Sequence, residues 1–222
     1  MTTEAQPRVP RIGILALQGA AREHARAVVE IGAEPVMVRL PRDLVDLDAL
    51  ILPGGESTTM RKLIDRYGLR EPILALARSG APLFGTCAGM ILLAGRIADG
   101  DEPVFGLLDV EVRRNAYGRQ LDSFEAELDV SAIGPEPLHA VFIRAPVVTD
   151  AGPGVEILAR DEHGQPVAVR QGRVLATAFH PELTGDRRLH ALLRTMIERR
   201  RSGQPPTEPH AGRAADERAG GA

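Results

Sequence analysis

Short apolar runs alternate with amphipathic segments along the first hundred residues of the chain. The runs carry almost no charge, as is typical of strands buried on both faces, and they cover residues 12–17, 35–38, 49–52 and 82–84. Between them, apolar residues recur at the three- and four-residue spacing of helices, in segments 21–31, 58–67, 71–78 and 88–95. This alternation predicts a parallel sheet that is covered by helices on both faces.

The second half of the chain is richer in extended segments. Gly and Pro separate apolar runs at 108–113, 124–128, 140–143, 155–159, 167–170 and 174–179, and a closing helix is predicted at 187–200. Neither an internal repeat nor a linker interrupts residues 11–200. The pattern therefore predicts one three-layer α/β domain, whose central sheet is mostly parallel and gains antiparallel strands late in the chain.

Both ends of the chain depart from this pattern. Residues 1–10 are polar and contain two prolines, and residues 202–222 mix Pro, Gly, Ala and charged residues without apolar periodicity. Such segments bury too little apolar surface to become ordered. We therefore expect a disordered N-terminus (1–10), a single domain (11–201) and a disordered C-terminal tail (202–222).

Composition narrows the function classes. With 44% apolar and 26% charged residues the chain is globular, and its net charge of -3 gives no attraction to nucleic acid or an acidic membrane. Five Phe, two Tyr and no Trp leave few platforms for stacked bases. The chain has one cysteine, a start unlike a secretory leader, and no apolar run near the roughly 18 residues that span a bilayer. We expect a cytoplasmic protein without nucleic-acid or membrane partners.

The lone cysteine lies in a motif that is typical of a nucleophile. Gly85, Cys87 and Gly89 form a G-x-C-x-G pattern where the predicted strand 82–84 meets the helix 88–95. Glycines two residues before and after let the backbone turn sharply, so that the sulfur projects from the sheet. A helix that starts there also favours the thiolate. The alternative is a small buried cysteine between two packing glycines.

A second candidate group ends the predicted strand 174–179. In an extended segment residues two apart point to the same side, so His180 and Glu182 are expected to lie together, with Pro181 stiffening the chain. A carboxylate on one ring nitrogen leaves the other free to exchange a proton with a thiol. Alone, this short motif is more typical of a solvated turn. Together with the cysteine motif, it predicts a Cys-His-Glu triad.

A glycine pair follows the strand 49–52. Gly54 and Gly55 lack a Cβ, so their backbone N–H groups are able to converge on an anion or an oxyanion. A tight turn followed by a helix that Ser57 caps is an equally simple interpretation, and both are compatible. A phosphate-binding loop is disfavoured because the G-x-x-x-x-G-K-[ST] spacing is missing.

Six segments together resemble the glutaminase subunits of pyridoxal 5'-phosphate synthase, a branch of the class I, or triad, glutamine amidotransferases. These segments are residues 17–19, 53–58, 85–89, 114–120, 142–146 and 179–183, and the likeness covers roughly 11–200 in order. The cysteine and His-Pro-Glu motifs alone would indicate only the broader class. The tail after about Ser202 has no counterpart in the family, and we expect no catalytic role for it.

The resemblance implies a flavodoxin-like fold and a role for each matching residue. Cys87 would be the nucleophile, His180 the general acid and base, and Glu182 the residue that orients the histidine. The remaining matches bind L-glutamine in the family and are Gly55, Glu56, Ser57, Arg114, Ile143 and Arg144. We expect the oxyanion to be held by the backbone N–H groups of Gly55 and Ala88. An arginine suits the α-carboxylate of the substrate, but the sequence does not separate Arg114 from Arg144.

The resemblance also implies a partner. The ammonia released from glutamine would pass to a (β/α)8-barrel synthase that builds pyridoxal 5'-phosphate, in a hetero-oligomer whose glutaminase is largely silent unless docked. The reaction is expected to use neither metal nor organic cofactor. Two alternatives remain open. The same triad would serve another amide-nitrogen pathway, such as that of histidine, or the chain would be a non-catalytic binding or chaperone member of the wider cysteine-elbow group.

Other candidate residues favour structural interpretations. An exposed helix position is favoured for His24 over one that faces the site or a partner. The other histidines lack the close spacing of zinc ligands, and they are His139, His163, His190 and His210. A solvated turn is favoured over a metal site for Asp43, Asp46 and Asp48, because the spacing of a calcium loop is absent.

Overall fold

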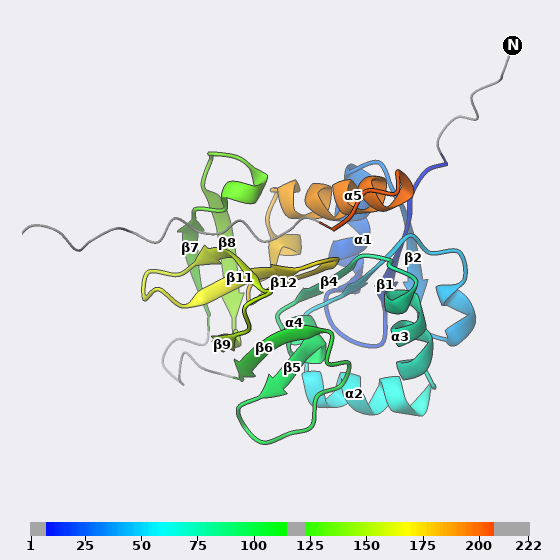
Figure 1. Ribbon diagram of the computed structural model, residues 1–222, viewed down its shortest axis with the longest axis horizontal. Coiled ribbons are helices and arrows are strands. Elements are labelled where there is room, and N and C mark those ends of the chain that lie inside the picture. The colour runs from blue at the N-terminus through cyan, green and yellow to red at the C-terminus, as the bar shows by residue number, and fades with distance from the viewer. Residues whose placement is uncertain (1–7, 115–122, 207–222) are drawn as a thin grey trace, which may run out of the picture.

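A seven-stranded sheet forms the centre of the computed structural model, which describes residues 8–114 and 123–206 (Figure 1). The strand order is β10-β11-β12-β4-β3-β1-β2. Five neighbouring strands pair in parallel, namely β1 (Arg11–Leu15), β2 (Glu34–Val38), β3 (Ala49–Leu52), β4 (Leu83–Thr86) and β12 (Val174–Thr177). Antiparallel β10 (Glu156–Arg160) and β11 (Pro166–Gln171) extend one edge. The predicted mostly parallel sheet with late antiparallel strands is confirmed.

Helices cover both faces of this sheet, as the alternating pattern predicts. α1 (Ala21–Glu30) and α5 (Arg188–Arg201) lie together on one face, and α2 (Ser57–Arg66) packs with α4 (Ala88–Leu93) on the other (Figure 1). α3 (Arg70–Arg78) follows α2. β3 is buried at every position, because parallel strands in the middle of such a sheet are enclosed by both helical layers.

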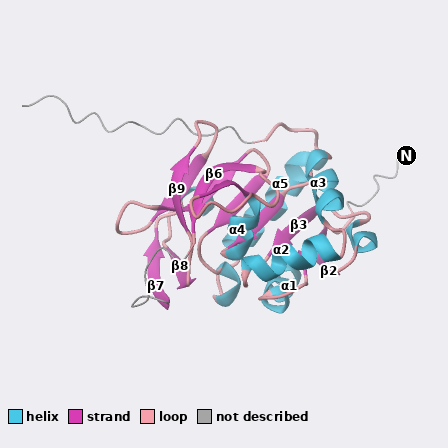
Figure 2. Ribbon diagram, turned by 90° about the horizontal axis from the view of Figure 1, so that it is seen from below, coloured by secondary structure: helices cyan, strands magenta, loops and turns pink. Residues whose placement is uncertain are grey.

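Two small sheets stand apart from the central one. β5 (Ala94–Ile97), β6 (Leu108–Arg113) and β9 (Val147–Ala151) form one, and β7 (Ser123–Leu128) pairs with β8 (Leu138–Ile143) in the other. Figure 2 shows β6–β9 gathered on one side of the molecule, away from α2. The apolar pattern did not predict β5 or β9. The predicted helix 88–95 extends two residues beyond the observed end of α4 at Leu93. The chain leaves that helix after Leu93 because Ala94 pairs with Leu108 of β6.

An ion-pair cluster joins segments that are far apart in the chain. The Asp48 carboxylate accepts hydrogen bonds from Arg8 (3.1 Å), from Arg201 (2.9 Å) and from the backbone N–H of Arg11 (2.8 Å). Its side chain is only 7% exposed, so the predicted solvated turn is wrong for this residue. Asp43 instead accepts hydrogen bonds from the N–H groups of Arg39 and Leu40 around a 3-10 turn, η1 (Pro41–Leu44).

Most of the two predicted disordered ends, residues 1–7 and 207–222, lies outside the described residues.

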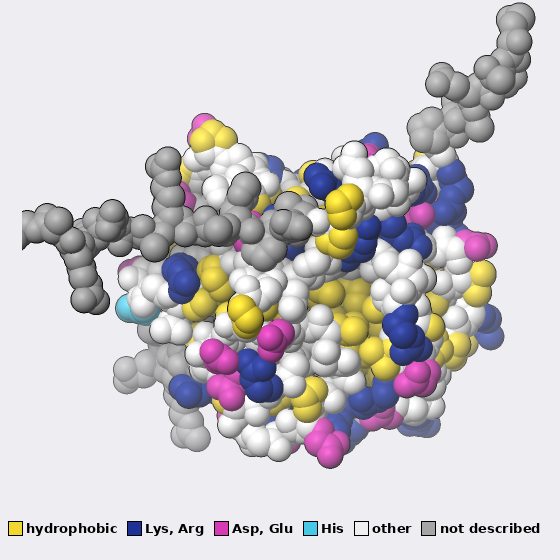
Figure 3. All heavy atoms as spheres, viewed as in Figure 1, with side chains coloured by type: hydrophobic (Ala, Val, Ile, Leu, Met, Phe, Trp, Pro, Cys, Tyr) yellow, Lys and Arg dark blue, Asp and Glu magenta, His cyan; other side chains and the backbone are white. Residues whose placement is uncertain are grey.

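Charges of both signs are mixed on the surface. On the face drawn in Figure 3, basic and acidic side chains of the described residues are interspersed, with apolar side chains between them. This distribution agrees with the small net charge of the chain. Within residues 8–114 and 123–206, no helix has the length and apolar character needed to cross a bilayer.

Candidate active site

Three loops meet where neighbouring parallel strands end. Gly54 and Gly55 follow β3, Cys87 follows β4, and His180 comes three residues after β12. β3, β4 and β12 are adjacent in the sheet, so the loops at their carboxyl ends share one edge. This is the edge at which open α/β sheets bind ligands.

Cys87 occupies a strained turn between β4 and α4. Its φ of 49° and ψ of -106° lie in a region of backbone conformation where residues other than glycine are rarely found. The backbone N–H of Cys87 donates to the Thr177 carbonyl of β12 (2.8 Å), which holds the turn in place. A Cβ on Gly89 would lie 1.9 Å from the Leu52 carbonyl oxygen, so this position requires glycine. The G-x-C-x-G pattern is thus the strand-to-helix elbow that its spacing predicts.

Gly54 brings the histidine and the cysteine together. A Cβ on Gly54 would lie 2.2 Å from His180 Cε1 and 3.3 Å from the Cβ of Cys87. Both side chains therefore pack against the same bare backbone. Cys87 is 6% exposed, and its sulfur lies 3.7 Å from the Ile143 carbonyl oxygen. The missing side chain at Gly54 is what allows the ring to approach the thiol.

Glu182 holds the other side of the imidazole. Nδ1 of His180 lies 2.7 Å from Oε1 of Glu182, and the carboxylate is fully buried. The expected proximity is present, although its predicted reason is wrong. Pro181–Leu183 form a 3-10 turn, η3, rather than an extended segment, and the turn brings the two side chains to the same side.

The surroundings of His180 favour its protonated form, the imidazolium. Burial lowers the pKa of His180, but its interactions with Cys87 and Glu182 outweigh burial and raise the pKa to about 10. With Nδ1 facing the carboxylate, Nε2 is left to exchange a proton with the thiol. A positively charged ring beside a sulfur stabilises the thiolate, which is the nucleophilic form.

The three loops open into a cavity of about 630 Å³. Cys87 and His180 line it, and so do the other residues that the sequence singled out, namely Gly55, Glu56, Ser57, Ala88, Arg114, Ile143 and Arg144. Glu182 lies behind His180 and does not line it. A larger hollow of about 840 Å³, between β7 and β10, contains none of these residues, so its size does not make it the candidate site.

The loop after β3 combines a free N–H group with a helix cap. Neither the Gly55 N–H nor the Ala88 N–H donates to another described residue, while the Glu56 N–H donates to Gln18 Oε1 (2.7 Å). Glu56, not Ser57, caps α2: its carboxylate accepts from the backbone N–H groups of Thr58 and Thr59. The hydrogen bond from the Thr59 hydroxyl, together with these N–H groups, outweighs the opposing effect of burial and lowers the pKa of Glu56 to about 2.

The two candidate arginines differ in their surroundings. Arg114 pairs with Asp99 (2.9 Å) and Asp101 (2.8 Å), and these pairs raise its pKa. The Arg144 side chain has no hydrogen bond or ion pair to any residue in the described part of the chain. Its backbone φ of 44° is positive, so the loop after β8 holds this residue in an unusual conformation. The rest of the motif that follows Arg114, residues 115–120, lies outside the described residues.

His24 does not occupy the exposed helix position that the sequence favours. The side chain is fully buried rather than exposed, and its Nε2 lies 3.4 Å from Oε2 of Glu182. A signal was available, because His24 shares a helix stripe with the buried Ala21, Ala27 and Val28. His190 is likewise fully buried on α5, beside Leu193 and Ile197.

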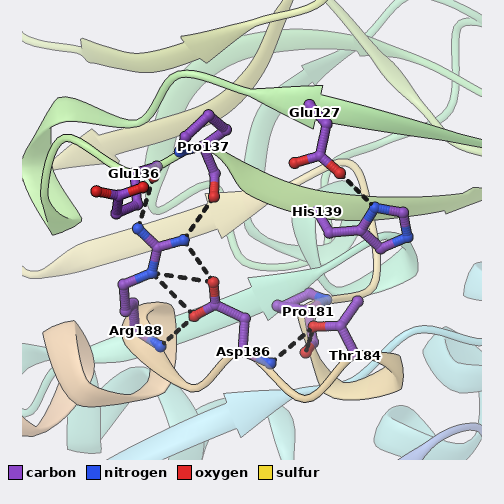
Figure 4. Close-up of polar contacts among 8 residues, drawn as sticks. All are labelled: Glu127, Glu136, Pro137, His139, Pro181, Thr184, Asp186 and Arg188. Atoms are coloured by element: carbon purple, nitrogen blue, oxygen red, sulfur yellow. Dashed lines mark hydrogen bonds and ion pairs between the residues drawn. The ribbon is translucent and has the colours of Figure 1, made fainter.

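A network around Arg188 fixes the segment that carries His180 and Glu182 (Figure 4). The Arg188 guanidinium donates to the carbonyl oxygens of Glu136 and Pro137 (2.6 and 2.8 Å) and pairs with Asp186. The Asp186 N–H donates to the Thr184 hydroxyl, which donates to the Pro181 carbonyl. The start of α5 is thereby tied both to η3 and to the chain before β8.

Comparisons with known proteins show the family and the fold of the chain. The model of the SNO glutamine amidotransferase family matches residues 14–199. A relative from Frankia alni, named pyridoxal 5'-phosphate synthase subunit PdxT, is 57% identical over 197 residues, which are 88% of this chain and 98% of the relative. A crystal structure of a glutamine amidotransferase superposes with a TM-score of 0.79 at 49% identity, covering 84% of this chain and 98% of that one. PurLQS from Thermotoga maritima, at 21% identity and a TM-score of 0.65 over 87% of this chain and 99% of that one, shares the fold.

Proposed function

Since this chain belongs to the SNO glutamine amidotransferase family, we propose that it is the glutaminase subunit of a pyridoxal 5'-phosphate synthase. It hydrolyses L-glutamine to L-glutamate and supplies ammonia to the synthase. One observation carries the proposal: Cys87 and His180 line one cavity with all the predicted substrate-binding residues, and Glu182 contacts His180 from behind.

The reaction begins with attack by the Cys87 thiolate on the side-chain amide carbon of glutamine. A C–S bond forms, and the amide oxygen becomes an oxyanion. In this proposal the N–H groups of Gly55 and Ala88 receive that charge, since both residues line the cavity and neither N–H donates to another described residue. One such donor is typically worth about 3–4 kcal/mol of barrier.

Collapse of this intermediate breaks the C–N bond. His180 donates its Nε2 proton to the departing nitrogen, which leaves as ammonia, and Cys87 is left as a γ-glutamyl thioester. The neutral ring then takes a proton from water, and the resulting hydroxide attacks the thioester carbon. Release of glutamate restores the thiolate and the imidazolium. Throughout, the Glu182 carboxylate fixes the ring and stabilises its charged form.

The α-carboxylate of glutamine binds to Arg144 in this proposal. A guanidinium matches a carboxylate bidentately, and Arg144 lines the cavity without a described partner. Arg114 is already neutralised by Asp99 and Asp101. This difference favours Arg144 over Arg114, a choice that the sequence left open.

The partner is a (β/α)8-barrel synthase subunit, which takes up ammonia before water protonates it. We place the complex in the cytoplasm, because the mechanism needs a reduced thiol at Cys87. A second candidate, service to another amide-nitrogen pathway, would require a different synthase. Co-purification of the full chain with its synthase, followed by identification of the product, separates the two.

A glutamate-release assay with the synthase present tests the central claim. Wild-type protein should release glutamate from glutamine, and Cys87→Ala should lose this activity while still binding the synthase. Activity that survives Cys87→Ala defeats the proposed nucleophile. No glutamate release by the wild-type complex would favour the non-catalytic alternative.

A further inference from the structure

Two buried histidines extend the polar chain behind the candidate triad. Nε2 of His24 lies 3.1 Å from the Thr86 hydroxyl and 3.4 Å from Oε2 of Glu182. On its other side, Nδ1 of His24 lies 3.0 Å from Nε2 of His190. Both histidines are fully buried, one on α1 and the other on α5. The glutaminase mechanism derived above uses neither of them.

Both rings are neutral at physiological pH. Burial first, and then the electrostatic cost of a further positive charge close to His190, His180 and Arg187, lower the pKa of His24 well below its usual value. Burial and Arg187 lower the pKa of His190 to about 4, against the weaker opposite effect of Glu30. A neutral imidazole has one N–H donor and one acceptor nitrogen, so the contacts decide where each proton lies.

The contacts select one set of tautomers. Nδ1 of His190 is buried without a hydrogen-bond partner among the described residues. A buried N–H without an acceptor forfeits a hydrogen bond that water would supply, so this nitrogen is the better place for the bare lone pair. The His190 proton is then on Nε2, where it is donated to Nδ1 of His24. His24 in turn carries its own proton on Nε2, facing Thr86 and Glu182.

One carboxylate oxygen of Glu182 lacks a hydrogen-bond donor among the described residues. Its Oε1 accepts from His180, but its Oε2 is buried without an aligned hydrogen bond in the described part of the chain. Nε2 of His24 is 3.4 Å from this oxygen, which is close enough for an ion pair, but the two groups are not aligned for a hydrogen bond. A carboxylate oxygen in a low-dielectric interior is strongly stabilised by a nearby N–H dipole. The His24 proton lies where a small rotation shares it between Thr86 and Glu182.

We propose that His24 is a positioning residue, whose Nε2–H steadies the Glu182 carboxylate, and that His190 sets the tautomer of His24. The inference rests on the proposed function, because its effect on turnover passes through Glu182 and His180. It makes an uncharged pair of histidines part of the machinery: through His24 on α1 and His190 on α5, the two helices together determine how firmly the catalytic imidazole is held. A merely structural role for His24 would change stability and leave turnover unchanged.

Two polar substitutions of similar size separate these roles. The amide nitrogen of glutamine reaches the position of Nε2, whereas that of asparagine reaches only the position of Nδ1. His24→Asn should therefore lower kcat about 10- to 100-fold, the size of the loss when a group that orients a metal-binding side chain is removed, with KM changed by less than about threefold. His24→Gln should recover most of kcat. Equal kcat values in His24→Asn and the wild type would overturn the proposal, as would failure of His24→Gln to exceed His24→Asn.

A packing control and a direct measurement complete the test. Leu193→Ala removes a fully buried side chain one turn beyond His190 on α5, so it should lower Tm and leave kcat unchanged. Nitrogen-15 NMR of the full chain labelled at histidine should show His24 and His190 neutral, both protonated on Nε2. An Nδ1–H tautomer at either residue overturns the assignment, even if the variants fail to fold.

Failure of this inference is distinguishable from failure of the proposed function. Impaired turnover in Glu182→Gln with normal turnover in His24→Asn removes only the role of His24. Normal turnover in Glu182→Gln removes the triad itself.

Discussion

The position of the His180 ring depends on a side chain that is missing at Gly54. A Cβ there would lie 2.2 Å from Cε1 of the ring, well inside any real contact, and the backbone behind it is fixed at the end of β3. We expect Gly54→Ala to push the ring away from Cys87 and to lower kcat about 10²-fold, as a displacement near 1 Å does. A glutamate-release assay measures it. Gly185→Ala, where a Cβ meets nothing within 4 Å, is the matched control and should keep full activity.

Glu182 acts on turnover rather than on binding. Glu182→Gln keeps the shape but removes the charge that holds the imidazolium, so kcat should fall about 10²–10⁴-fold with little change in KM. Because Glu182 contributes to the raised pKa of His180, its loss lowers that pKa. The alkaline limb of the kcat/KM profile, set by deprotonation of the ring, should therefore move to lower pH. An unmoved limb contradicts the assigned role.

Arg144 should act on binding. Removing a charge-assisted contact with the α-carboxylate costs about 1.5–3 kcal/mol, so Arg144→Ala should raise the KM for glutamine roughly 10- to 150-fold with a smaller effect on kcat. Arg114→Ala, whose guanidinium Asp99 and Asp101 already engage, should raise KM less. The opposite order of the two KM values would transfer the role to Arg114.

The sequence shows which residues carry chemistry more clearly than how they are held. Cys87 and His180 follow apolar runs within motifs, and both are found at the ends of adjacent parallel strands. The contact of His24 with Glu182 joins residues 158 positions apart in the chain. Such a contact depends on how α1 packs against η3, and nothing in local spacing reports it. The role of Ser57 was misjudged because Glu56, one residue earlier, provides the longer side chain that reaches both N–H groups.

At the level of elements, Glu56 stabilises the first turn of α2. Its carboxylate accepts from two N–H groups of the first turn, and Glu56→Ala should lower the free energy of unfolding by about 0.5–2 kcal/mol. The folded-state pKa, about 2, lies below the usual 4.5. This contribution is therefore present above pH 4.5 and is lost as pH falls toward 2. Urea denaturation at pH 7 and pH 3 should show the difference between wild type and Glu56→Ala shrinking. Glu162→Ala, at an exposed position, should show no such difference.

Periodicity predicted the helices and most of the strands, including strands of only four residues such as β3 and β4. Every predicted helix and strand is present within a few residues, because buried parallel strands and amphipathic helices leave strong apolar patterns. β5 and β9 were missed. Ala94–Ile97 continue an apolar helix in the sequence, and only the neighbouring β6 makes them extended. Likewise, the polar Thr149 and Asp150 hide the strand Val147–Ala151, whose partner is also β6.

At the scale of the whole molecule, Asp48 fastens both ends of the described domain to the sheet. Arg8 before β1 and Arg201 at the end of α5 both pair with it. Asp48→Asn should lower the free energy of unfolding by about 1–3 kcal/mol, because a buried acceptor loses its charge, while kcat stays unchanged. Urea denaturation measures the loss. Asp150→Asn is the control, since its exposed pair with Arg96 should contribute only about 0–1 kcal/mol. An equal loss in both variants would contradict this account.

The Asp48 cluster also has a practical consequence. It lies before β1 and β3, at the amino ends of the parallel strands, whereas Gly54, Cys87 and His180 follow the carboxyl ends. Residues 8 and 201 touch each other there, through a hydrogen bond from the Arg201 guanidinium to the Arg8 carbonyl (2.7 Å). A dye, a fusion protein or a chip surface attached beyond either residue would therefore hold the enzyme at the amino ends of its parallel strands. The catalytic pocket, at the carboxyl ends, would stay accessible.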